Sequence, residues 1–289
     1  MKILGVIPAR YASSRFPGKP LADLLGKSMV ERVYLQCKKS KHLSEIVVAT
    51  DHQQIHDHVL AFGGNSCITS DTHPSGTDRC CEAMTLQKSS FDFVINIQGD
   101  EPFIDPQQID LLCASLDAQT ELATLIQRII TLEQLQSPNE AKVILNSRME
   151  AMYFSRSPIP YVQKQPQSSW LDHTTFYRHV GLYAYRQDIL RALTKLPVSE
   201  LERAESLEQL RWIENGYKIK TVETDAEEGM CIDTPEDLEK ARIHMRSISH
   251  GRQQEVRRQI QSERVETTLP FLRPAYLFGR NYQSSQPNC

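Results

Sequence analysis

Near its N-terminus the chain carries a segment whose residue types suit an anionic ligand. Between Pro8 and Leu21 there are three cations, Arg10, Arg15 and Lys19, and no acidic residue. Small residues around them allow close approach to main-chain N–H groups, and such donors combined with cations suit a polyphosphate. The spacing is neither that of a Walker loop nor that of a dinucleotide fingerprint. The alternative is a solvated basic surface loop.

A carboxylate is predicted at the end of a later strand. The apolar run Phe91–Ile97 leads directly into Gln98-Gly99-Asp100-Glu101-Pro102. Asp100 is therefore expected at the carboxyl end of a central strand, where α/β sheets bind their ligands. Facing the three cations, it could hold a magnesium ion that neutralises nucleotide phosphates. The alternative is that Asp100 and Glu101 only form a turn before a helix beginning at Pro106.

Two further motifs have both a structural and a chemical interpretation. Ser75-Gly76-Thr77-Asp78-Arg79 predicts a turn into a helix over Thr77–Gln87, with Ser75 and Thr77 as possible caps. Its hydroxyl and main-chain groups could instead read the edge of a base. Asp233-Thr234-Pro235-Glu236-Asp237 predicts a capping box at a helix start. Capping leaves Asp233, after an expected strand over Gly229–Ile232, without a structural role.

Three polar segments follow in the second half of the chain, and spacing alone does not connect them. Arg156 precedes two prolines, which hold an extended backbone, so that its planar fork could grip a sugar-acid carboxylate. A lone arginine is more often a surface cation. The strand Tyr177–Arg186 alternates, with Val180, Leu182 and Ala184 on one face and with His179, Gly181, Tyr183 and Tyr185 on the other.

The third of these segments is helical. Glu205–Arg211 is expected on a helix whose core stripe is Leu201, Leu207 and Leu210. Glu208 and Gln209 could point elsewhere on that helix, although most such pairs are only solvated. The intervening stretch Gln163–Thr175 is rich in Gln and Ser and predicts a mobile loop.

The elements that position these groups alternate along the first hundred residues. Apolar runs predict strands, and apolar residues at helical spacing predict helices. Such alternation implies right-handed crossovers and a parallel sheet, and thus an α/β fold. The expected early elements are strands at Ile3–Ile7, Glu45–Thr50 and Cys67–Thr69 and helices at Ser28–Ser40 and His52–Phe62. Later strands are expected over 123–130 and 142–145, with a hairpin partner over 150–154.

Composition narrows the class of protein. The 289 residues carry a formal charge of −3, which argues against nucleic-acid binding by bulk charge. Seven cysteines without a Cys-x-x-Cys pair indicate free, mostly buried thiols in a reducing compartment. Met1–Ile7 is too short for a signal peptide, and no apolar run reaches membrane-spanning length. The protein is expected in the cytoplasm.

One possible metal site is not favoured. His52 and His56 are four residues apart on a predicted helix, a spacing that can bind zinc. No Glu follows His52 as in the metalloprotease motif. We therefore interpret these imidazoles as part of a solvated helix face.

Taken in order, the motifs resemble those of the cytidylyltransferases that activate 3-deoxy-manno-octulosonate (Kdo), the CMP-Kdo synthetases. The resemblance rests on the segments Ile7–Leu21, Ser75–Arg79, Gln98–Pro102 and Asp233–Asp237 and covers roughly residues 1–250. It implies a Rossmann-like, mostly parallel sheet of the nucleotidyltransferase type with a smaller β-rich insert. It also implies the reaction of CTP with Kdo to CMP-Kdo and diphosphate, for bacterial lipopolysaccharide.

The resemblance implies a role for each group of residues. Lys19, Asp100 and Asp233 would be catalytic, and the two aspartates would bind Mg²⁺. The residues implied to hold the nucleotide are Pro8, Ala9, Arg10, Arg15, Lys19, Ser75, Gly76, Thr77, Arg79 and Gln98. Those implied to hold the sugar acid are Gln98, Arg156, His179, Tyr185, Glu208 and Gln209.

The resemblance also implies an oligomeric state, and two alternative functions stay open. The resemblance implies a homodimer built through residues 125–190, within a nucleotidyltransferase domain of residues 1–250, and no nucleic-acid or membrane partner. Residues 251–289 form a C-terminal extension to which the sequence assigns no function. One alternative keeps the chemistry and changes the sugar acid to 8-amino-Kdo or a sialic-acid-like sugar. The other is a non-catalytic nucleotide-sugar sensor, against which the presence of both Asp100 and Asp233 argues.

Overall fold

The structure is a computed structural model that describes residues 1–12, 15–226 and 229–247. The chain divides into two compact units, Met1–Arg242 and Ile243–Cys289, and the fold below is that of the first. The expected domain boundary near residue 250 and the C-terminal extension lie outside the described residues. Among the described residues, no helix has the length and apolar character needed to cross a bilayer.

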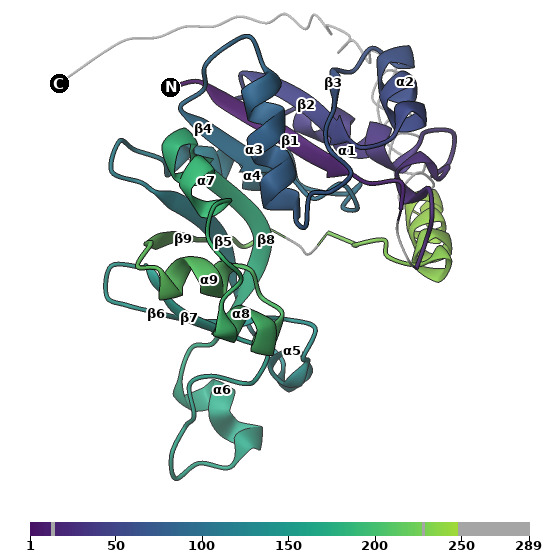
Figure 1. The fold of residues 1–289 in the computed structure, drawn as a ribbon. Coiled ribbons are helices and arrows are strands. Elements are labelled where there is room, and N and C mark those ends of the chain that lie inside the picture. Colours follow the sequence, from purple (N-terminus) through teal and green to yellow (C-terminus); the bar gives the residue numbers. More distant parts are fainter. Residues whose placement is uncertain (13–14, 227–228, 248–289) are drawn as a thin grey trace, which may run out of the picture. The chain divides into compact units, whose positions relative to one another are not determined.

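The first half of the chain forms the parallel part of one sheet (Figure 1). Strand β1 (Ile3–Ala9) lies between β2 (Glu45–Thr50) and β4 (Phe93–Asn96), and β3 (Ser66–Ile68) extends the sheet beyond β2. All of these pairs are parallel, and the strands are within two residues of the predicted bounds at most ends. The predicted α/β fold with a mostly parallel sheet is therefore confirmed.

The second half adds antiparallel strands. The long β8 (Tyr177–Arg186) pairs antiparallel with β4 and with β5 (Leu122–Arg128), and β9 (Ile219–Glu223) closes the order β3-β2-β1-β4-β8-β5-β9. The predicted hairpin is present as β6 (Lys142–Leu145) and β7 (Ala151–Ser155), and β6 also pairs with the start of β8. The second half of the chain therefore differs from the first in that most of its strand pairs are antiparallel.

Helices connect the strands, and several begin at side-chain caps. Ser28, Ser75 and Asp105 each accept a backbone N–H of the following turn. Such caps satisfy N–H groups that the first helical turn leaves unpaired. The labelled helices are α1 (Met29–Cys37), α2 (Gln53–Ala61), α3 (Gly76–Leu86), α4 (Pro106–Ala114), α5 (Leu132–Gln136), α6 (Trp170–His173), α7 (Gln187–Leu193), α8 (Glu200–Glu205) and α9 (Gln209–Glu214), with 3₁₀ turns at Lys19–Leu21 and Gln167–Ser169. A further helix begins at residue 235, as predicted, and Thr234 Oγ1 accepts the Asp237 N–H at 3.2 Å as its cap.

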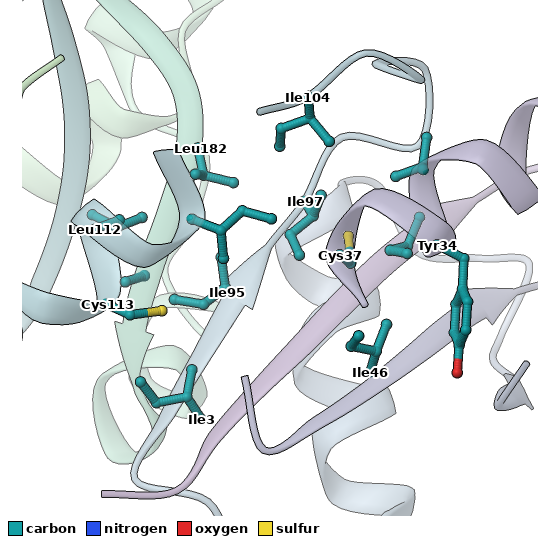
Figure 2. Close-up of a cluster of buried hydrophobic side chains, with 14 of the residues drawn as sticks. Ile3, Tyr34, Cys37, Ile46, Ile95, Ile97, Ile104, Leu112, Cys113 and Leu182 are labelled. Carbon is teal, nitrogen blue, oxygen red and sulfur yellow. The ribbon is translucent and has the colours of Figure 1, made fainter. Parts of the chain in front are cut away.

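The core lies on both faces of the sheet because strand side chains alternate. Ile3 and Ile7 of β1 belong to one apolar cluster, shown in part in Figure 2, and Leu4 and Val6 belong to the other. From Leu182 to Tyr185 on β8 the alternation is the predicted one. Leu182 and Ala184 lie in the first cluster, and Tyr183 and Tyr185 lie in the second.

Two predictions about the chain after residue 200 are wrong. Residues 205–211 do not form one helix, because α8 ends at Glu205 and Ser206 adopts the left-handed conformation with φ 51° before α9 begins. Residues 229–232 do not form a strand, although the Ile232 N–H donates to the Asp100 carbonyl at 3.0 Å. An apolar stripe cannot reveal such a break, since Leu201 before it packs against the same apolar cluster that contains Leu207 and Leu210 after it.

Two other local predictions also need correction. Gln163–Thr175 is not a loop throughout: it contains a 3₁₀ turn and α6, and Trp170 is buried in a stack on Phe176 with ring centroids 6.1 Å apart. The buried Trp170 side chain fixes a segment whose polar composition predicts a mobile loop. Thr77 is not a cap but the second residue of α3.

Gly99 is required by close packing at the end of β4. A Cβ at this position would lie 2.5 Å from the carbonyl oxygen of Pro8, which is a backbone atom of the adjacent β1. The absence of a side chain therefore lets the turn after β4 approach the end of β1.

We expect Gly99→Ala to lower the free energy of unfolding by about 1–3 kcal/mol, the usual penalty for overpacking against atoms that cannot move aside. Urea denaturation measures this value. Gly76→Ala is the matched control, because its Cβ would make ordinary contacts of 3.5 Å or more at the start of a helix. Equal destabilisation by both substitutions would contradict the close approach.

Candidate functional site

The geometric centre of the site is the ammonium of Lys19. Its Nζ lies 2.9 Å from Asp100 Oδ2 and 3.0 Å from Asp233 Oδ1. These partners are 81 and 214 residues away in the sequence. Gly18, in the left-handed region with φ 69°, turns the chain immediately before Lys19. The predicted convergence of the basic segment with two distant aspartates is thus present in the structure.

Lys19 is charged in this arrangement. Its side chain is only 14% exposed, and this burial by itself would lower the pKa of the amine. The charges and hydrogen bonds of Asp100 and Asp233 outweigh burial, so that the pKa of Lys19 is raised above its ordinary value. A cation is therefore held between two carboxylates that would otherwise repel each other.

The donor set around Lys19 fits a hard divalent cation. One ligand atom from each of Asp100, Cys231 and Asp233 lies within 4.8 Å of the others. Carboxylate oxygens are the protein ligands that Mg²⁺ prefers, whereas a thiol suits softer metals. The two aspartates alone therefore fit the magnesium expected at this point. Cys231 was missed: it lies two residues before Asp233 in the sequence, and only the fold brings its thiol near both carboxylates.

The other two cations of the basic segment lie on either side of this centre. Arg15 is 65% exposed and reaches Asp233 Oδ2 at 3.2 Å. Arg10 donates to the carbonyl of His73 at 2.7 Å, next to the Ser75 turn. The basic segment therefore spans from the aspartates to the turn that the sequence identified as base-reading.

Arg79 lies beneath the site and not in it. Its side chain is fully buried, with hydrogen bonds to Thr69 and, at 2.9 Å, to Asp51. The other oxygen of Asp51 accepts the Tyr11 N–H at 3.3 Å. This packing does not favour the predicted direct contact of Arg79 with a nucleotide. Instead, the guanidinium donates to Asp51, and Asp51 accepts a backbone N–H at the start of the basic segment.

The remaining predicted nucleotide residues gather at the ends of β1 and β4. Pro8 and Ala9 close β1. A Cβ on Gly76 would lie 3.8 Å from the Pro8 ring, so the Ser75 turn and the end of β1 are neighbours. Gln98 follows β4 and donates to the carbonyl of Gly181 on β8 at 2.9 Å. Gln98 therefore joins the parallel half of the sheet to the antiparallel half.

A cavity of about 290 Å³ opens beside the aspartates. Arg156 and His179, two predicted sugar-binding residues, line it, and so does Cys231. The Arg156 guanidinium is aimed by three backbone carbonyls, those of Pro138, Glu205 and Ser206. The other lining residues are Glu101, Gln108, Asn139, Glu140, Ala141, Arg178, Val180, Gly181, Leu207 and Gly229.

Arg178 and the acidic and amide groups of this lining were missed by the sequence analysis. Arg178 is the clearest omission, because it adjoins His179 in the sequence but projects from the opposite face of an ideal strand. The pairing of β8 with β5 shifts between Thr124 and Leu125, which partner Tyr183 and Val180 respectively. This irregularity breaks the simple alternation, and nothing in the sequence signals it.

Four predicted sugar-binding residues do not line the cavity: Gln98, described above, and Tyr185, Glu208 and Gln209. Tyr185 is 1% exposed and packs edge-on against Trp212, and Gln209 is 5% exposed. Glu208 accepts hydrogen bonds from Ser75 Oγ at 3.0 Å and from Thr77 Oγ1 at 2.8 Å. Burial raises the pKa of Glu208, against the opposing effect of the two hydroxyl donors. Tyr185, Glu208 and Gln209 therefore support the base-reading turn from behind.

His179 is a neutral group in the folded protein. It borders the cavity, but its ring packs against Phe154 and Tyr183 and bonds Thr124 Oγ1 at 3.1 Å. Burial, with a contribution from the charge of Arg178, lowers the pKa of His179 to about 3. His179 can therefore donate or accept a hydrogen bond near neutral pH without carrying charge.

The histidine pair on α2 forms no metal site within the described residues. The group Asp100, Cys231 and Asp233 is the one candidate cluster found there. His52 caps α2 and stacks on Tyr11 with ring centroids 4.0 Å apart. Both His52 and His56 are half-buried, so the expectation of a fully solvated face is only partly right. The six described cysteines are all free, as predicted.

Comparisons with known proteins agree on one family. A family model described as cytidylyltransferase matches residues 4–222. The 3-deoxy-manno-octulosonate cytidylyltransferase of Parabacteroides distasonis is 54% identical over 246 residues, covering 83% of this chain and 97% of that protein. The protein of the same name from Bacteroides thetaiotaomicron is 50% identical over 253 residues, covering 86% of this chain and 100% of that protein.

A solved structure is similar over nearly the same range. CMP:2-keto-3-deoxy-manno-octonic acid synthetase complexed with CTP has a TM-score of 0.79 and 43% identity, covering 86% of this chain and 99% of its own. A 4-diphosphocytidyl-2C-methyl-D-erythritol synthase from Anaerococcus prevotii has a TM-score of 0.54 at 15% identity and shares the fold alone.

The bridging position of Lys19 generates a test that needs no substrate. In Lys19→Met the two aspartates lose their cation, and we expect the free energy of unfolding in chelator to fall by about 1–3 kcal/mol. Magnesium should restore part of this loss, because it replaces the missing charge. Urea denaturation with and without magnesium chloride measures both effects.

Lys27→Met is the control for that experiment. Lys27 lies just before α1 and pairs with Glu31 in the first turn of that helix, and a partly exposed ion pair contributes at most about 1 kcal/mol. Its loss should be small and independent of magnesium. If the free energy of unfolding of Lys19→Met did not change on addition of magnesium, the two carboxylates would not share a cation site.

Proposed function

Because the chain belongs to the family of 3-deoxy-manno-octulosonate cytidylyltransferases, we propose that it catalyses the reaction of CTP with Kdo to give CMP-Kdo and diphosphate. The observation that carries the proposal is the cation position between Asp100 and Asp233, directly beside the cavity lined by Arg156. A triphosphate and a sugar acid are both anions that bind to cations, and here the cation Lys19 lies next to the cavity that contains Arg156.

The reaction follows from this arrangement. The anomeric hydroxyl of the sugar attacks the α-phosphorus of CTP, a new O–P bond forms, and the bond to the diphosphate leaving group breaks as the hydroxyl proton passes to solvent. No covalent enzyme intermediate is needed, so that positioning and charge stabilisation do the catalysis. A magnesium ion held by Asp100 and Asp233 would neutralise phosphate oxygens and lower the pKa of the attacking hydroxyl.

The residues of the chain divide between the two substrates. Arg10, Arg15 and Lys19 bind the triphosphate, and Lys19 moves its ammonium from the aspartates to phosphate oxygens. The turn Ser75–Thr77 presents hydroxyl and main-chain groups to the cytosine edge, beside the ends of β1 and β4. Gln98 lies between the two subsites because its amide reaches Gly181 on β8.

The sugar acid occupies the cavity. Its carboxylate is bound by the Arg156 guanidinium, which Pro138, Glu205 and Ser206 hold in one direction. A rigid planar fork is well suited to a carboxylate. The neutral His179 imidazole offers a hydrogen bond to a sugar hydroxyl. Arg178 adds positive charge to the same wall.

The wider setting of the enzyme is also part of the proposal. We infer a homodimer formed through residues 125–190, and a cytoplasmic location, which the free thiols of the described cysteines suit. CTP and Kdo are available to an enzyme in that compartment as soluble substrates, and the product supplies lipopolysaccharide synthesis.

A substrate panel tests the function. Diphosphate release is measured with each of the four ribonucleoside triphosphates against Kdo, 8-amino-Kdo and a sialic acid, in the presence of magnesium. We expect CTP with Kdo to be the best pair. Higher turnover with 8-amino-Kdo or with the sialic acid would change the assigned substrate and keep the chemistry, and no diphosphate release with any pair would leave only a binding function.

Asp100→Asn tests the role of the carboxylate in the chemical step. Loss of one group that stabilises the transition state costs on the order of 3–4 kcal/mol, so turnover with magnesium should fall by roughly a few hundredfold. Initial rates of diphosphate release at saturating CTP and Kdo measure the change.

Asp110→Asn on α4 is the control, because its carboxylate accepts only from Ser40 and Lys41 outside the site. It should retain most of the turnover. An Asp100→Asn enzyme within about fivefold of the parent would remove Asp100 from the reaction.

A further inference from the structure

Four consecutive residues, Glu205–Glu208, lie between the two subsites, and we refer to them as the bridge segment. At one end, the Glu205 carboxylate accepts the Ser155 hydroxyl at 2.6 Å and the Arg156 N–H at 2.9 Å. The Glu205 and Ser206 carbonyls accept from the Arg156 guanidinium at 2.7 and 3.3 Å. This end of the bridge segment therefore determines where the guanidinium points.

The other end holds the base-reading turn. The two oxygens of Glu208 divide between Ser75 Oγ at 3.0 Å and Thr77 Oγ1 at 2.8 Å. Between the ends, Leu207 is 8% exposed and contributes to the wall of the cavity. Glu208 itself does not line that cavity.

The bridge segment is short and conformationally constrained. It is the junction of α8 and α9, and Ser206 holds the left-handed conformation that lets the chain turn between the two helices. Leu207 and Leu210 on either side of Glu208 are anchored in the core. A movement of Arg156 is therefore transmitted to Glu208 through only two intervening residues.

We infer that Glu208 is a positioning residue that holds the Ser75–Thr77 turn in register with the cavity, so that the nucleotide and the sugar acid bind with positive coupling. This inference rests on the proposed function. The contacts of Arg156 with the Glu205 and Ser206 carbonyls and those of Glu208 with the two hydroxyls are formed in one conformation of the bridge segment, and each ligand stabilises that same conformation. By linkage, each ligand must raise the affinity of the other by the same factor.

Calorimetry with an unreactive pair measures the coupling. CMP lacks a diphosphate leaving group, so the affinities of CMP and Kdo can be measured separately and together without turnover. We expect saturating Kdo to raise the affinity of the parent protein for CMP by at least fivefold, within the usual range for coupled sites. A factor near one in the parent protein would overturn the inference.

Glu208→Gln should abolish this coupling. The glutamine keeps one acceptor oxygen and has an NH2 donor in place of the other, so that one hydroxyl of the turn loses the acceptor for its proton. We expect CMP alone to bind more weakly, the coupling factor to fall to near one, and the affinity for Kdo alone to stay within twofold. In steady state the KM for CTP should rise by more than kcat falls. Weaker Kdo binding with unchanged CMP binding would instead place Glu208 directly on the sugar.

Two further variants separate the loss of coupling from a general loss of stability. Glu202→Gln breaks a carboxylate–Arg211 pair between α8 and α9 without touching the turn, and it should leave the coupling factor unchanged. Thr77→Val removes one of the two hydroxyl partners and should reproduce most of the effect of Glu208→Gln. The double variant Thr77→Val with Glu208→Gln should lose little more than either single variant, and full additivity would overturn the inference.

The failure of this inference is distinguishable from failure of the proposed function. Diphosphate release with CTP and Kdo by the parent protein, combined with a coupling factor of one, removes the role of the bridge segment alone. Absence of diphosphate release with every pair of the substrate panel removes the proposed function, on which the inference rests. Circular dichroism and melting temperature of each variant establish that it is folded before its binding is compared, and Thr77→Val decides the matter where Glu208→Gln does not fold.

Discussion

The contact of one ammonium with two carboxylates is the interaction on which the site depends. Lys19 brings together the segment after β1, the turn after β4 and the start of the helix at residue 235. Two aspartates this close would repel each other without a cation. The arrangement is therefore stable only with a positive charge at its centre, which in this structure is the ammonium of Lys19.

The sheet explains why these groups can meet. Strands β1 and β4 are parallel neighbours, so their carboxyl ends lie at the same edge, and Gly99 permits their following turns to approach closely. The antiparallel β8 then lies beside β4 and brings Gly181 next to Gln98. The parallel and the antiparallel parts of the sheet thus meet at β4.

Several groups act on the site through others. Arg79 holds Asp51, which holds the Tyr11 backbone, and Glu208 holds the hydroxyls of Ser75 and Thr77. A buried charge is stable only when it is paired or hydrogen-bonded, so such groups have their bonds committed within the protein. Short side chains at the strand ends and an exposed arginine are left to meet the ligand. The hydrogen bonds behind the site therefore determine where the groups on its surface lie.

The sequence by itself determined the local features: the strands β1, β2 and β8, the Ser75 and Thr234 caps, and the motifs that carry cations and carboxylates. These depend on residues adjacent in the chain, such as alternation along a strand or a hydroxyl three residues before an N–H. Only the tertiary structure decided that Cys231 and Arg178 border the site while Arg79, Tyr185 and Gln209 are buried behind it. It also decided that a break at Ser206 divides a stretch with a continuous apolar stripe. The physical reason is that burial is set by contacts between different elements, as when Glu208 meets Thr77 131 residues earlier in the chain, and the local sequence pattern carries no record of them.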